Sequence, residues 1–142
     1  MSMTWIVVAN ASLAKLYENP GPNKGLQLVK EMAHPESREK AANLVSDRIG
    51  NFQGSGSYAQ ATDPKQHEMD RFALEIAKVL EAGRLGNAFS RLVLVSSAPF
   101  IGRVRQHLGE QVKGKVSDSI EKDYTKLSLK DLSDHLGGVL RL

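Results

Sequence analysis

A polar stretch from Ser46 to Glu68 carries the residue types in this chain that could do chemistry. It contains an Asp-Arg pair, three glycines within seven residues, two glutamines in its middle and a tyrosine. One guanidinium group can donate two parallel hydrogen bonds to a phosphate, and an aromatic ring can stack on a nucleic-acid base. An RNA-contacting loop, a catalytic lid and an inert connection are all compatible with this composition. With one basic residue that precedes the stretch, the candidate binding-loop residues are Arg38, Asp47, Arg48, Gln53, Gly54, Gly56, Tyr58 and Gln60.

Residues 50–63 are expected to form a flexible loop with an ordered base at Asp47-Arg48. Glycine loses more conformational entropy on ordering than other residues, and only Phe52 and Tyr58 offer large apolar surface in return. Arg48 has two open roles, since an Asp-Arg pair can brace nearby backbone or contact a ligand.

Carboxylates for a two-metal nuclease are missing where such an enzyme needs them. These enzymes hold metal ions with carboxylates from several core elements. The apolar runs TWIVVA and RLVLVSS contain no Asp or Glu, and the first ends in Asn10, a poor ligand for Mg²⁺. Glu68, Asp70 and Glu75 fall on a predicted helix, where a solvated face is the ordinary explanation. We therefore predict no catalytic residue, metal or cofactor.

Possible zinc-binding, serine acyl-enzyme and phosphate-binding motifs are all incomplete. The four histidines include no His-x-x-x-His pair for zinc. Ser37 and Lys40 match Ser-x-x-Lys without the companion motifs of serine acyl-enzymes. Gly54-Ser55-Gly56 follows no strand directly and is not continued by Gly-Lys-Ser/Thr, so it is a poor phosphate cradle. The histidines are His34, His67, His107 and His135.

Basic residues are the remaining candidates for binding a ligand. They could grip phosphates or simply form a solvated surface, and their spacing leaves both interpretations open. The residues in question are Arg38, Lys40, Arg48, Arg103, Arg105, Lys113 and Lys115.

The first third of the chain predicts three antiparallel strands. The run 4–9 is apolar and β-branched, 13–18 alternates, and 26–32 follows a break with two prolines and two glycines. Asn10-Ala11 is expected to form the first hairpin turn, because Asn tolerates positive φ.

The second half changes to helical periodicity. Helices are predicted over 64–82, with Gly83 as the stop, and over 99–108 and 129–136, with Leu129, Leu132 and Leu136 facing inward. Strands are predicted at 91–97 and within 113–124, and a short helix at 37–48. The fold is therefore α/β, with a mixed five-stranded sheet in the βββαβαβα order of ribonuclease-H-like domains. The predicted core comprises Trp5, Val7, Phe72, Ile76, Val93, Val95, Phe100 and Val104.

Composition indicates one soluble domain over residues 1–142. The chain has no cysteine, a net charge of +3 and a pI of about 9.2. Its N-terminal apolar run is too short for a signal peptide or a membrane span. We expect a cytoplasmic protein.

Several blocks resemble the bacterial host-attachment protein family over nearly the whole chain. In order they are TWIVVANASLAKLYE, HPESREKAANLVSDRIG, HEMDRFALEIAKVL, RLVLVSSAPFIGRVRQHL and IEKDYTKLSLKDLSDHL. The most specific pieces are Ser46-Asp47-Arg48 and LVLVSSAPFIG.

This resemblance also implies a relation to the middle domain of archaeal and eukaryotic peptide-chain release factors. There the corresponding loop carries a Gly-Gly-Gln tip that enters the ribosome. Here Gln53-Gly54-Ser55-Gly56 has the residue types but not the motif. The resemblance therefore implies a non-catalytic module that binds RNA or the ribosome, without DNA specificity. The alternative is a role in attachment to host cells, direct or through regulation.

Overall fold

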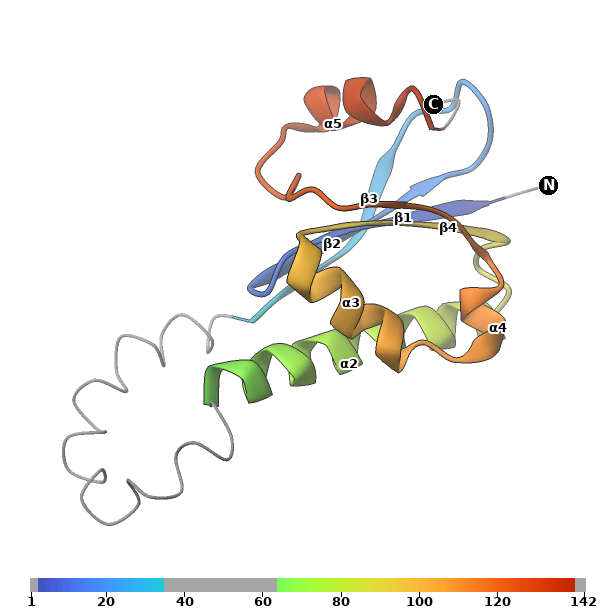
Figure 1. Ribbon diagram of the computed structural model, residues 1–142. Helices are drawn as coiled ribbons and strands as arrows, with labels where there is room; N and C mark the ends of the chain where they lie inside the picture. The colour runs from blue at the N-terminus through green and yellow to red at the C-terminus, as the bar shows by residue number, and fades with distance from the viewer. Residues whose placement is uncertain (1–2, 35–63, 140–142) are drawn as a thin grey trace, which may run out of the picture.

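The computed structural model describes residues 3–34 and 64–139. Figure 1 shows a sheet with helices on both of its faces. The strands are β1 (Thr4–Ala9), β2 (Leu13–Asn19), β3 (Gln27–Ala33), β4 (Arg91–Ser96) and β5 (Val116–Ile120). The helices are α2 (Pro64–Leu85), α3 (Ala98–His107), α4 (Glu110–Lys113) and α5 (Leu129–Leu136).

The strands form one mixed sheet in the order β3-β2-β1-β4-β5. β1 pairs with β2 and β2 with β3 in antiparallel fashion, whereas β4 runs parallel to β1 and β5 parallel to β4. The predicted α/β class, with three antiparallel strands first, is confirmed. The likeness to ribonuclease-H-like domains and to the release-factor middle domain stays a prediction.

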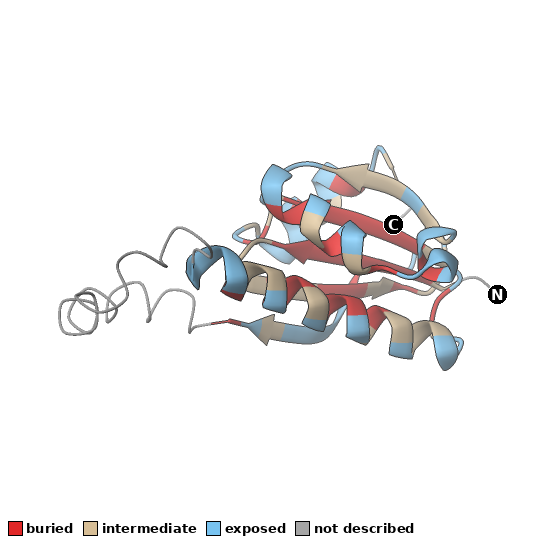
Figure 2. Ribbon diagram, turned by 60° about the horizontal axis from the view of Figure 1, so that its bottom comes forward, coloured by how far each residue is buried: buried red, intermediate tan, exposed pale blue. Residues whose placement is uncertain are grey.

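β1 and β4 lie inside the sheet and are buried on both faces, which explains their continuous apolar sequences. Alternate residues of β1 point to opposite faces. Trp5, Val7 and Ala9 pack with α2, α3 and α4, whereas Ile6 and Val8 pack with α5. Figure 2 shows buried residues along the central strands and along the side of the long helix that faces them. All eight predicted core residues are buried.

Helix α2 runs beyond its predicted stop, and Gly83 lies inside it. Phe89 stacks on Trp5 with ring centroids 4.8 Å apart. A Cβ at position 83 would lie 2.5 Å from two atoms of the Trp5 ring. Glycine is therefore needed here for close packing, not for a helix stop, and the sequence-based interpretation was wrong.

The hairpin turn between β1 and β2 lies at residues 10–12, where it was predicted, but the reason differs from the one predicted. Asn10 is not among the residues with positive φ in the described chain. Its Oδ1 instead accepts hydrogen bonds from the backbone N–H groups of Ser12 and Leu13, at 2.8 and 2.9 Å. The turn thus depends on the Asn10 side chain, and its backbone bond runs from Asn10 N–H to the Leu13 carbonyl.

Two smaller differences concern the C-terminal part. Leu129 was expected inward but is 48% exposed, while Leu132 and Leu136 are buried as predicted. The four-residue α4 was not predicted, because one helical turn has no periodicity to detect. The predicted helix at 37–48 lies outside the described residues.

Candidate functional site

The carboxyl ends of four strands meet at one edge of the sheet. β1, β4 and β5 are mutually parallel, and β3 has the same direction because two antiparallel steps separate it from β1. Ligands of open α/β sheets bind outside the carboxyl ends of the strands. This carboxyl edge is therefore the natural place to look for a site.

Asn10 follows β1 at this edge and ties distant segments together. While its Oδ1 accepts the two turn bonds, its Nδ2 donates to Asp123 Oδ2 at 3.0 Å and to Thr125 Oγ1 at 3.2 Å. Both ends of the amide are therefore used within the protein. Asn10 serves as a structural tie between the hairpin and the segment that follows β5.

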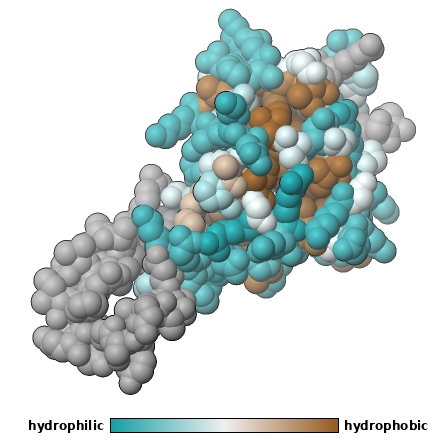
Figure 3. Space-filling view, in the orientation of Figure 1, coloured by the Kyte–Doolittle hydropathy of each residue, from teal (hydrophilic) through white to brown (hydrophobic). Residues whose placement is uncertain are grey.

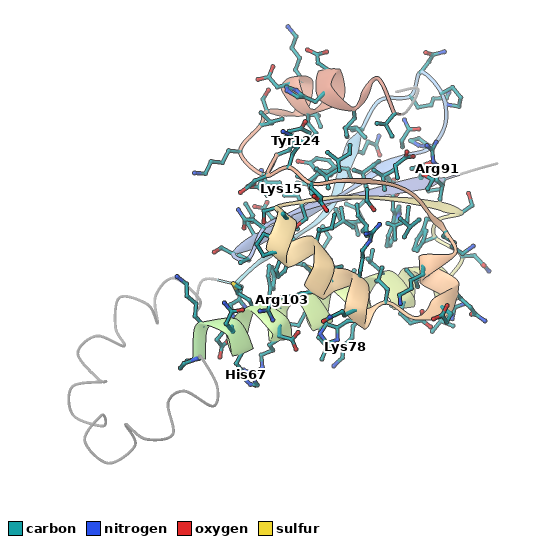
Figure 4. All side chains as sticks on the ribbon, viewed as in Figure 1. Lys15, His67, Lys78, Arg91, Arg103 and Tyr124 are labelled. Atoms are coloured by element: carbon teal, nitrogen blue, oxygen red, sulfur yellow. The ribbon has the colours of Figure 1, made fainter. Side chains whose placement is uncertain are left out.

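Asp123 is the ionisable member of this junction. Burial by itself raises the pKa of the Asp123 carboxyl, but hydrogen bonds from the Thr125 hydroxyl, Asn10 and the Thr125 backbone, with the nearby charge of Lys126, outweigh it and lower the pKa. Lys15 Nζ of β2 donates a hydrogen bond to the Thr125 carbonyl at 3.0 Å, which adds a second link between the hairpin and the segment after β5. Figure 4 labels Lys15 near Tyr124, on the side of the sheet covered by α5.

Acidification is expected to remove the stabilisation that Asp123 provides. A carboxyl with a lowered folded pKa stabilises the fold above its unfolded pKa, about 3.9, and the contribution disappears as the pH falls through the folded value. The thermal midpoints of the parent and Asp123→Asn should differ at pH 7 and converge below about pH 4. A difference that stays constant from pH 7 to pH 3 would contradict this role.

A second contact joins the two ends of the described chain on either side of residues 35–63. His34 Nε2 lies 3.0 Å from Glu68 Oε1, and the two side chains are only 7% and 11% exposed. The backbone N–H of His34 donates to the Ser12 carbonyl at 2.8 Å, and its ring packs 5.2 Å from that of Phe72. Glu68 was expected on a solvated helix face, and this expectation was wrong. Thirty-three intervening residues hid the pairing from sequence analysis.

A neighbouring polar cluster holds α3 against α2. Asp70 Oδ1 lies 3.0 Å from His107 Nε2 and 3.7 Å from Arg103 Nη1, and Arg103 also donates to Gln66 Oε1. Figure 4 shows Arg103 between the two helices. Of the basic residues considered as phosphate contacts, Arg103 therefore has a structural role in the fold.

None of the candidate loop residues falls in the described part of the chain. Arg38, Asp47, Arg48, Gln53, Gly54, Gly56, Tyr58 and Gln60 all lie within 35–63, so their binding role stays a prediction. Over 3–34 and 64–139, no group of three or more His, Asp or Glu side chains could hold a metal ion. Within the same ranges, no helix has the length and apolar character needed to cross a bilayer.

The protein is an α/β domain in which polar side chains at the carboxyl ends of the strands, such as Asn10 and His34, bind residues distant in sequence. The family model described as "Protein required for attachment to host cells" matches residues 5–136. The chain belongs to this family, as its sequence blocks indicated. Comparison with curated proteins found no match.

Proposed function

We propose that this protein is a non-catalytic, cytoplasmic module that binds an RNA-rich target such as the ribosome through residues 35–63. The observation that carries the proposal is the buried contact between His34 and Glu68, 3.0 Å apart. It fixes both attachment points of this segment at the carboxyl edge, where α/β folds bind ligands. A segment presented from a rigid base is the common way in which proteins position binding loops.

The chemistry of the segment supports an RNA target. Arg38 or Arg48 would contact phosphate, and Gln53 or Gln60 would lie nearest the target. Tyr58 offers a ring for stacking on an unpaired base. Without a Gly-Gly-Gln motif the segment binds rather than catalyses peptide release. Contacts of this kind read no base edges of a duplex, so no DNA specificity is expected.

Replacing Gln53 through Gln60 with a short Gly-Ser linker should abolish co-sedimentation with ribosomes from the native cells. The parent should sediment with ribosomes at low salt and be released as salt rises, because phosphate contacts displace counterions. The thermal midpoint of the variant provides the control for folding. A variant that is folded and sediments like the parent would show that the segment is only a connection.

The family description favours a second function, in attachment to host cells. A cytoplasmic RNA-binding module would affect attachment indirectly, by regulating the synthesis of other proteins. In a deletion strain, attachment should be restored by the parent gene but not by the linker variant. Native protein found on the cell surface would instead favour direct attachment.

A further inference from the structure

A groove of about 360 Å³ lies between α3 and β5, lined by Arg105, Leu108, Lys113 and Val116. We call it the α3–β5 groove. Arg105 Nη2 donates to Ser119 Oγ of β5 at 2.7 Å, so its guanidinium is held over the strand. Figure 3 shows hydrophobic surface on the viewed face, bordered by hydrophilic side chains. The groove thus combines two cations with two apolar side chains.

An irregularity in β5 places Val116 on the side of the sheet that the groove occupies. The register shifts between Leu92 and Val93, so Ser117 is an extra residue opposite β4. Val116 therefore packs on the α2 and α3 side of the sheet, although Ile120 packs on the α5 side. Ser119 lies on the same side as Val116, where it accepts a hydrogen bond from Arg105 of α3. Asp118 lies on the other side and pairs with Arg91, which also donates a hydrogen bond to the Val139 carbonyl beyond α5.

The cations of the groove have no ion pair among the described residues. Arg71, Arg84, Arg91 and Arg103 each have a carboxylate oxygen within 3.7 Å, but the partner of Arg105 is the neutral Ser119. Within residues 3–34 and 64–139, Lys113 and its neighbour Lys115 likewise form no ion pair. Glu110 lines a separate groove between α2 and α4, and Asp118 is bound by Arg91. The positive charge is therefore available to an anion.

We propose that the α3–β5 groove binds the phosphodiester backbone of single-stranded RNA. Arg105 and Lys113 contact phosphate oxygens, and Leu108 and Val116 contact the adjoining sugar or base. Small-molecule sites span roughly 300–1,000 Å³, so a groove at the lower end holds one nucleoside with the phosphate on each side of it, one for Arg105 and one for Lys113, rather than a duplex. The inference rests on the proposed RNA association and adds a second contact, because α4 lies at the opposite end of the fold from the start of α2 (Figure 1).

The test measures binding of the full-length chain to a fluorescently labelled single-stranded RNA dodecamer over a range of salt. Each phosphate contact contributes about 0.7 to the slope of log K against log salt for a single strand. Arg105→Gln with Lys113→Gln should therefore make the slope shallower by about 1.4. The affinity lost between about 50 and 200 mM salt should then be about sevenfold smaller than for the parent.

Two control variants distinguish RNA binding at the groove from a general effect of the protein's net charge. Lys24→Gln with Lys130→Gln removes the same charge from exposed positions elsewhere and should behave like the parent. Arg105→Lys with Lys113→Arg keeps both charges and should retain most of the slope. An unchanged slope in the glutamine variant, an equal loss in the Lys24 and Lys130 variant, or no binding by the parent would overturn the proposal.

Ribosome co-sedimentation distinguishes this inference from the proposed function. If the linker variant loses ribosomes while the glutamine variant binds the dodecamer like the parent, the proposed function stands and the groove does not. If the glutamine variant shows the shallower slope while the linker variant sediments normally, the groove stands and residues 53–60 are not the ribosome contact.

Discussion

Phe72→Ala is expected to lower the free energy of unfolding by about 3–5 kcal/mol. The Phe72 side chain is fully buried where α2 meets the sheet. Its ring lies 5.8 Å from that of Phe100 and 5.2 Å from that of His34. Truncation removes these contacts and leaves a cavity that a rigid strand and a 22-residue helix cannot close. Urea denaturation followed by circular dichroism would measure the loss.

Leu85→Ala is the matched control, since it also shortens an apolar side chain on α2. Leu85 is 67% exposed, so its truncation should change stability by no more than about 0.5 kcal/mol. Equal denaturation midpoints for Phe72→Ala and the parent would show that the helix does not pack on the sheet through this face.

Gly83→Ala is expected to destabilise the protein by about 1–3 kcal/mol, the usual cost of overpacking a core. Helix propensity alone predicts the opposite sign, because alanine is favoured over glycine inside a helix by about 1 kcal/mol. The packing effect should dominate, since the new Cβ would lie 2.5 Å from the Trp5 ring and 3.2 Å from Phe89 Cε1. Trp5 is only 7% exposed and stacks on Phe89, so the ring cannot move aside freely.

Gly102→Ala provides the comparison, because Gly102 also lies inside a helix but has nothing within 4 Å of an added Cβ. It should raise stability by up to about 1 kcal/mol through propensity. Thermal denaturation of both variants would check the contrast in sign. Stabilisation by Gly83→Ala would mean that the Trp5 ring has space to move, and the close-packing argument would then be wrong.

Phe72→Ala and Gly83→Ala also test which contacts hold the carboxyl edge of the sheet in place. Phe72 packs against His34, whose contact with Glu68 fixes the attachment points of residues 35–63. A cavity at Phe72 should therefore loosen these points, whereas strain at Gly83, near the other end of α2, should leave them in place. If residues 35–63 bind ribosomes as proposed, co-sedimentation measured at a temperature where both variants are folded would distinguish the two effects.

The sequence by itself determined the five strands, the three longer helices, the mixed α/β fold and the eight predicted core residues, because local apolar periodicity records which faces of a strand or helix avoid water. The runs at Thr4–Ala9 and Arg91–Ser96 therefore identified the interior strands, and the spacing of Phe72 and Ile76 identified the buried face of α2.

Only the tertiary structure decided which polar residues meet. The Asn10 amide reaches Asp123 across 113 positions, and His34 reaches Glu68 across 34. No local pattern records such contacts, because a pair of polar residues has no period. The bulge at Ser117 likewise depends on pairing with β4, and it brings Val116 and Ser119 to the face where Arg105 lies. The residues that line the α3–β5 groove are close in sequence, but the side of the sheet on which Val116 lies depends on how β5 pairs with β4.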